Sequence, residues 1–183
     1  MGIRDRWVSL LHRVATGTKK TRMLLTPIGV VIFGAFTGLF VILAVIVDRL
    51  LSLSWPLSSV LSWLIAAPLI SIGVGLTAWS ASHFLKVKGT PVPFNPPPTL
   101  VMTGPYQFVR NPMLTGVFLL LFGIGFAIKS LSLVAFFTPL FVLANLWELK
   151  EIEEPELVKR LGADYVAYHE RTPMFIPGMR LRK

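Results

Sequence analysis

The chain has 183 residues, of which 54% are hydrophobic, and its mean hydropathy is +0.68. This composition excludes an ordinary soluble domain and indicates one integral membrane domain over residues 1–183. The formal net charge of +9 does not indicate nucleic-acid binding, because the basic residues flank apolar stretches and do not line one face. Cysteine is absent and the three histidines are scattered, so we expect no metal site.

Residues 1–25 are basic, and their apolar residues recur with helical spacing. Trp7, Leu10, Leu11 and Val14 follow the i, i+3, i+4, i+7 pattern that gives a helix one apolar face. We therefore predict an interfacial amphipathic helix over 1–25, lying among anionic lipid headgroups. The segment is too long and too charged for the start of a signal peptide, so we expect it in the mature protein.

Apolar stretches of spanning length follow. Residues 26–47 are uncharged and reach the ~20 residues needed to cross a bilayer. Residues 57–85 are long enough to cross with a tilt, which makes 26–85 two transmembrane helices. Residues 113–149 hold two shorter segments joined by a two-residue turn. The first reaches only about 24 Å, so we predict a helical hairpin that barely spans. The expected fold is all-α, with about four transmembrane helices.

Two polar blocks interrupt this pattern. Residues 86–112 hold seven prolines, each of which fixes φ and removes a hydrogen-bond donor, so no helix runs through them. Asn111 and Pro112 then suit the N-cap and first position of the next helix. The second block, 150–183, is charged and is predicted to form a helical lid that Pro155 interrupts. We expect the two blocks to fold together and build one site.

The distribution of charge predicts the topology. If both termini and both polar blocks are cytoplasmic, only Arg49 and Lys129 of the eighteen Lys and Arg lie outside. This is a strong positive-inside bias. The outer loops are too small to hold a site, so any chemistry is expected at the cytoplasmic face.

Three charged residues of the polar blocks are candidates for chemistry. Arg110 precedes a helix N-terminus, where free N–H groups and the helix dipole favour a carboxylate or phosphate. Glu153 and Glu154 are adjacent and point about 100° apart on a helix. One can face a bound cation or ribose while the other pairs with Arg or Lys. The alternative is a solvated charged helix, with Arg110 serving only to orient the protein.

The motifs GPYQFVRNPMLTG and EEPELVKRLGADYVAYHERTPMFIP, with a helical hairpin between them, resemble a known paired signature. It is that of the isoprenylcysteine carboxyl methyltransferase and phospholipid methyltransferase family. The resemblance covers the C-terminal half, from Gly89 onward. It implies a membrane methyltransferase that uses S-adenosylmethionine, without a Rossmann domain, and releases S-adenosylhomocysteine. The acceptor would be lipid-like (an isoprenoid, a prenylcysteine-type molecule or a phospholipid) and would enter from the bilayer. We separately expect the protein in the inner (plasma) membrane of a prokaryote.

Site residues carry over by position. The resemblance makes Arg110 the residue that orients the acceptor or the methionine carboxylate, and Glu154 the partner of the acidic cofactor ligand. If the acceptor is an ammonium, Glu154 or Tyr106 is the candidate to remove its proton. Tyr165 and Tyr168 are expected to pack within the lid. The expected cofactor-binding residues are Thr99, Leu100, Val101, Tyr106, Asn111, Pro112, Met113, Leu114 and Glu153.

The chain departs from the family pattern at functionally relevant positions. Leu114 stands where the family prefers Tyr, and Leu149 stands where prenylcysteine enzymes carry an Arg that engages the substrate carboxyl. Two alternatives stay open. One is an NADPH-dependent membrane reductase of the sterol-reductase type, in which Arg171 and Lys159-Arg160 would hold the 2′-phosphate. The other is a non-catalytic membrane scaffold.

Overall fold

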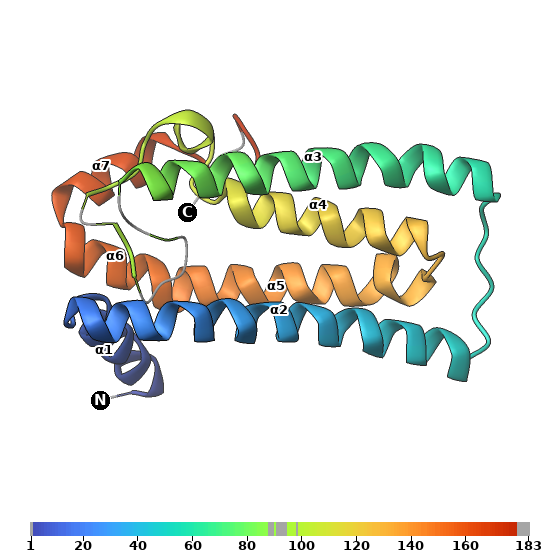
Figure 1. Ribbon diagram of the computed structural model, residues 1–183, viewed down its shortest axis with the longest axis horizontal. Coiled ribbons are helices and arrows are strands. Elements are labelled where there is room, and N and C mark those ends of the chain that lie inside the picture. The colour runs from blue at the N-terminus through green and yellow to red at the C-terminus, as the bar shows by residue number, and fades with distance from the viewer. Residues whose placement is uncertain (1, 88–89, 91–94, 98, 179–183) are drawn as a thin grey trace. The chain divides into compact units, whose positions relative to one another are not determined.

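The structure is a computed structural model that describes residues 2–87, 90, 95–97 and 99–178. All the regular elements in these ranges are helices, which confirms the all-α prediction (Figure 1). The chain forms two compact units. The apolar unit, Phe33–Ala78 with Met113–Asn145, holds only three charged residues (Asp48, Arg49 and Lys129). The polar unit comprises Met1–Ile32, Trp79–Pro112 and Leu146–Lys183.

Three helices are long and apolar enough to cross a membrane. They are α2 (Lys19–Leu50), α3 (Ser59–Lys86) and the continuous helix Leu133–Leu161. Helix α4 (Pro112–Ala127) is apolar but has only 16 residues, so a fourth span stays a prediction. The apolar part of the third helix ends at Trp147. Six of the eleven residues 151–161 are charged, so we place them outside the membrane, which leaves the eighteen residues 133–150 to cross it.

The helix Leu133–Leu161 contains two π-helical segments. They are η2 (Leu133–Phe137), which precedes α5 (Thr138–Glu148), and η3 (Leu149–Glu153), which precedes α6 (Glu154–Leu161). Each is followed within two residues by a proline, at 139 and 155. A proline lacks an N–H and clashes with the carbonyl four residues earlier, and a wider turn relieves the clash. The interruption predicted at Pro155 is therefore a π segment inside a continuing helix.

Glycines allow α3 and α4 to approach closely in the apolar unit (Figure 1). A Cβ on Gly73 would lie 2.7 Å from the carbonyl oxygen of Gly116, so a larger residue there would force the helices apart. Phe141 is fully buried, with the rings of Phe40 and Phe118 at 5.3 and 6.1 Å.

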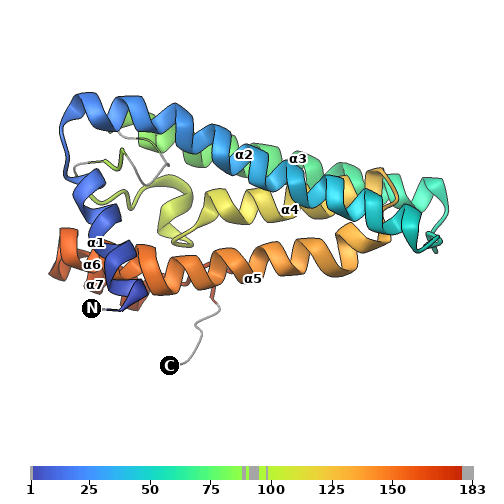
Figure 2. The ribbon, with the colours of Figure 1, turned by 90° about the horizontal axis from the view of Figure 1, so that it is seen from below.

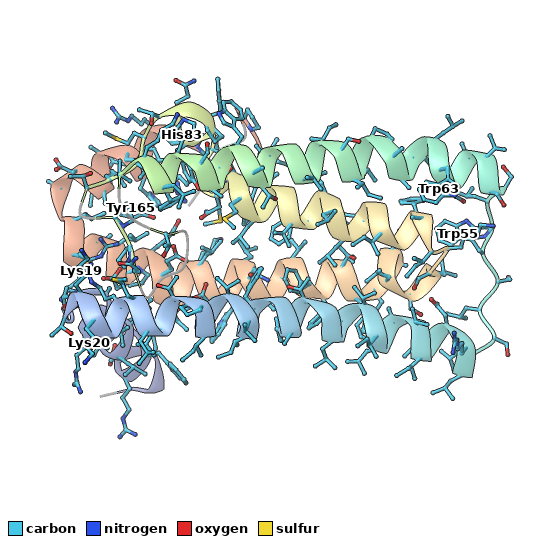
Figure 3. The ribbon with its side chains drawn as sticks, viewed as in Figure 1. Lys19, Lys20, Trp55, Trp63, His83 and Tyr165 are labelled. Atoms are coloured by element: carbon cyan, nitrogen blue, oxygen red, sulfur yellow. The ribbon has the colours of Figure 1, made fainter. Side chains whose placement is uncertain are left out.

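The hairpin turn of the apolar unit is tied by polar contacts. Asp48 accepts hydrogen bonds from the Ser130 hydroxyl and, at 2.9 Å, from the Ser132 N–H. Lys129 has φ +57° in this turn. Trp55 and Trp63 lie at one end of this unit (Figure 3), and the Trp55 indole N–H donates to Ser62 at 2.7 Å.

The polar unit is built around the charged continuation of the third helix. Helix α1 (Ile3–Ala15) lies against η3 and α6 (Figure 2), so the predicted interfacial helix ends at Ala15 and residues 19–25 belong to α2. Helix α7 (Ala163–Arg171) packs on α6 after a turn at Gly162, whose φ of +60° suits glycine. The short 3₁₀ helix η1 covers Gly104–Gln107.

Candidate functional site

The two polar blocks are joined by backbone hydrogen bonds. The Arg110 N–H donates to the Pro173 carbonyl at 2.8 Å, and the Asn111 N–H donates to the Met174 carbonyl at 3.0 Å. The Tyr168 hydroxyl donates to the Tyr106 carbonyl at 2.6 Å. The loop before α4 and the C-terminal segment therefore form one structure, as the sequence predicts.

Arg110 is the central cation of this structure. Its Nη1 donates to the carbonyls of His169 and Thr172 at 2.9 and 2.8 Å, and its Nη2 pairs with Glu154 Oε1 at 2.6 Å. The side chain is only 9% exposed. Its Nε is buried and has no hydrogen-bond partner in the described part of the chain. A buried donor of this kind is costly unless a ligand satisfies it.

Glu154 is shared between two basic side chains. Its Oε1 pairs with Arg110, and its Oε2 lies 3.3 Å from His169 Nε2. The carboxylate is 14% exposed and is held on both sides, so its position is well defined. This matches the expectation that one of the two adjacent glutamates pairs with Arg.

Glu153 has a different environment. Within the described residues its carboxyl group forms no hydrogen bond or ion pair. Burial is the main cause that raises its pKa to about 8, and the nearby carboxylates of Glu148, Glu156 and Glu154 raise it further, against a smaller lowering by Arg160. The carboxyl is therefore mostly protonated at neutral pH. A cation placed beside it would lower that pKa and favour the charged form.

Three buried tyrosines surround these charged residues. Burial raises the pKa of Tyr106, Tyr165 and Tyr168, so all three keep their proton at neutral pH. Tyr106 is hydrogen-bonded to Ser80, and its ring meets that of Phe84 edge-on at 5.2 Å. Tyr106 is therefore a poor candidate for the proton acceptor, and its ring is a structural part of the loop.

A comparison with protein families matches residues 61–164 to the model described as phospholipid methyltransferase. The matched stretch is more than half of the chain and contains α4, the hairpin and both glutamates. The chain belongs to the phospholipid methyltransferase family. No curated protein and no solved structure was found to match it. The family makes this protein a membrane methyltransferase that acts on lipid.

The cofactor-binding residues predicted for this family member lie in both units. Val101 and Pro112 are buried, Leu100 and Asn111 are half-buried, and Thr99 is exposed, all in the polar unit. Met113 and Leu114 are half-buried in the first turn of α4 and belong to the apolar unit. Tyr106 and Glu153 also belong to the polar unit. Their roles toward a cofactor stay predictions.

Sequence reasoning missed His169, because a single histidine without spacing to other ligands carries no motif. Its carbonyl accepts from Arg110 and its ring faces Glu154. It also missed that residues Thr172–Met174 would supply carbonyls to the Arg110 region. A signal was present, since Thr172 precedes a proline and is biased toward extended backbone, which stops α7 there.

His83 explains why the GPYQ turn of this methyltransferase needs glycine at position 104. Gly104 has φ +61°, and a Cβ built on it would lie 2.2 Å from His83 Nε2. The His83 Nδ1–H donates to the Trp79 carbonyl at 2.9 Å within α3, which fixes the ring (labelled in Figure 3). Only glycine fits between this imidazole and the turn.

Proposed function

We propose that this methyltransferase uses S-adenosylmethionine to methylate a phospholipid amine at the cytoplasmic face of a prokaryotic inner (plasma) membrane, releasing S-adenosylhomocysteine. The observation that carries the proposal is the Arg110–Glu154 ion pair next to the unpaired Glu153, inside the family match. S-adenosylmethionine would supply a methyl group bonded to a positively charged sulfur. The protein's task is to align that group with the acceptor and to exclude water.

The residues of the polar unit fit this cofactor. It carries two cationic groups, a carboxylate and ribose hydroxyls. Glu153 is a carboxyl without a partner among the described residues, and it supplies an acceptor for a hydroxyl or a cation. The buried Nε of Arg110 supplies a donor without a partner. We assign the remaining contacts to the polar-unit residues that the resemblance indicates (Thr99, Leu100, Val101, Tyr106, Asn111 and Pro112), and the roles of Met113 and Leu114 stay predictions.

Arg110 and Glu154 would act together at the acceptor. Two carbonyls and one carboxylate hold the Arg110 guanidinium, so its orientation is set before any ligand arrives. Such preorganisation avoids reorganisation during the reaction. An ammonium acceptor must lose a proton before it attacks the methyl group. Glu154 and the His169 imidazole beside it form the acid–base pair that takes this proton.

Two observations favour an amine over a carboxylate acceptor. The description of the matched family, phospholipid methyltransferase, names phospholipids as the substrates. In addition, the position where prenylcysteine enzymes carry an Arg is Leu149, which is 2% exposed. A buried leucine offers no charge to a substrate carboxylate.

The proposed orientation rests on charge. Residues from both ends of the chain belong to the polar unit. Placing this unit in the cytoplasm leaves only Arg49 and Lys129 of the eighteen Lys and Arg outside, in agreement with the positive-inside rule.

No observation favours the reductase alternative. Arg160, one of the residues expected to bind a 2′-phosphate, donates to Glu156 at 3.0 Å and to the Pro97 carbonyl at 3.3 Å. Its charge is already engaged, and the family match is to methyltransferases.

Calorimetric titration tests the proposal and separates the alternatives. The purified protein is titrated with S-adenosylmethionine, S-adenosylhomocysteine and NADPH, alongside Glu153→Gln and the matched control Glu170→Gln, which alters an exposed carboxylate on α7. We expect micromolar binding of both adenosyl ligands, weakened at least tenfold but still measurable in Glu153→Gln and unchanged in Glu170→Gln. Absence of binding by either ligand, in protein shown to be folded, refutes the proposal. Binding of NADPH would support the reductase.

A further inference from the structure

Helix α1 has one side that packs within the polar unit. At about 100° per residue, Arg4, Val8, Leu11 and Ala15 share this side. Ala15 is 4% exposed, and the α1 helix contacts η3 and α6. The Arg4 Nε donates to the Glu151 carbonyl at 3.3 Å, and this is the carbonyl that Pro155 leaves without its helical partner. The contact is therefore specific.

The other side of α1 is exposed. Arg6, Trp7, Leu10 and Arg13 fall within an arc of roughly 120°, and all four are exposed, with Trp7 at 54% and Leu10 at 47%. In the described part of the chain neither arginine forms an ion pair. A helix face that combines apolar side chains with free cations is typical of the membrane interface.

The chain that follows places this face near the bilayer. Helix α2 begins at Lys19, with three residues between it and the end of α1, and is a candidate membrane span. Lys19 and Lys20 are exposed at its start (Figure 3), and the apolar run of the span follows from Met23. The two lysines therefore lie at the level of the lipid headgroups. Four Cα–Cα steps separate Ala15 from Lys19 and span at most about 14 Å, so the C-terminal end of α1 lies close to this level.

We propose that this face of α1 (Arg6, Trp7, Leu10 and Arg13), together with Lys19 and Lys20, binds anionic phospholipid headgroups of the membrane that α2 crosses. Lys and Arg are attracted to the negative surface of a membrane, and Trp favours the boundary between water and hydrocarbon. An acidic soluble partner would match the charges, but it would not provide the apolar layer that Trp7 and Leu10 require.

Headgroup binding by α1 would also hold η3 and α6 in place. The packed side of α1 reaches Glu151 through Arg4, and His12 Nδ1 lies 3.3 Å from Glu156 Oε1. Glu156 is one of the carboxylates beside Glu153. The same helix therefore contacts the proposed lipid layer on one side and the neighbourhood of the site on the other.

The absence of cysteine makes a site-specific probe simple. Leu10→Cys, carrying a bimane label, is reconstituted in nanodiscs of phosphatidylcholine alone or with 30% phosphatidylglycerol, each with the same amount of headgroup spin-labelled lipid as quencher. We expect at least twofold stronger quenching with the anionic lipid, reduced by 0.5 M salt. A label at Ala167→Cys, exposed on α7, should show no difference between the two lipids.

Charge variants in the Leu10→Cys background complete the test. Arg6→Gln with Arg13→Gln should lower the equilibrium constant for headgroup contact about fivefold per charge. Arg6→Lys with Arg13→Lys should leave it unchanged, which also reports that substitution at these positions preserves the fold. Equal quenching in both lipids, or no loss in the glutamine variant, overturns the proposal. Heparin protecting the label from iodide more strongly than anionic lipid does would assign the face to a soluble polyanion instead.

Discussion

The raised pKa of Glu153 leads to a quantitative prediction about cofactor binding. A carboxyl with a pKa of about 8 is about 90% protonated at pH 7. If S-adenosylmethionine binds beside the ionised form, its binding must release about 0.9 proton at pH 7. The dissociation constant should then fall about tenfold from pH 6 to pH 7 and about fivefold from pH 7 to pH 8, with little change above pH 9.

Calorimetry at pH 7 in phosphate and in Tris measures this proton release, because the two buffers differ in ionisation enthalpy. Glu153→Gln supplies the baseline, since any titration of the cofactor's own amino group persists in that variant. We expect the observed binding enthalpy to differ between the two buffers in the wild type, and this difference to fall to the baseline value in Glu153→Gln. Proton release that is equal in the wild type and Glu153→Gln would show that Glu153 does not ionise on binding, and the reasoning would fail.

The same pKa fixes the sign of a stability effect. The pKa of Glu153 is higher in the folded protein than in the unfolded chain. The contribution of Glu153 to the free energy of unfolding is therefore fully present below about pH 4.5 and is lost as the pH rises through about 8. Thermal unfolding without ligand should show Glu153→Gln gaining stability over the wild type between pH 5 and pH 8. A constant difference across this range would contradict the raised pKa.

Three further substitutions test the structure around the site by thermal or denaturant unfolding. Arg110→Leu leaves the Glu154 carboxylate without its main partner and should cost about 3–5 kcal/mol, and a loss below 1 kcal/mol would rule out a structural ion pair. Gly104→Ala places a methyl group against the His83 ring at positive φ and should lower the free energy of unfolding by at least about 1 kcal/mol. Adding His83→Ala should restore part of this stability. If it restores none, the clash is not with this ring. Tyr168→Phe removes a buried hydrogen bond and should cost about 1 kcal/mol, whereas an unchanged stability would mean that the bond does not form.

The local signals in the sequence predicted much of the fold. The span predicted over 57–85 is α3, Ser59–Lys86, because apolar length and flanking polar residues define a membrane helix. Pro112 begins α4 and Gly162 ends α6, as their backbone preferences require. These features depend on residues close together in the chain.

The arrangement of the site was only partly predictable. The residues alone indicated that one adjacent glutamate would pair with Arg or Lys but not which one, and only the resemblance assigned Glu153 to the cofactor. Adjacent residues point about 100° apart, and the π segment η3 changes the helical phase just before Glu154. The contacts of Arg110 with the carbonyls of His169 and Thr172 join residues 59 and 62 positions apart. No local pattern encodes such separations. The break between α1 and α2 at residues 16–18 was also missed, because no proline marks it.

The most direct test of the account is methyl transfer itself. The protein is reconstituted in nanodiscs that contain phosphatidylethanolamine and is incubated with S-adenosylmethionine labelled in its methyl group, beside Glu153→Gln and Glu170→Gln. We expect labelled phospholipid with the wild type and Glu170→Gln, and at least tenfold less labelled phospholipid with Glu153→Gln. Label transferred equally by Glu153→Gln would contradict the proposed site. A failure to label any lipid, in protein that binds S-adenosylmethionine, would contradict the proposed acceptor.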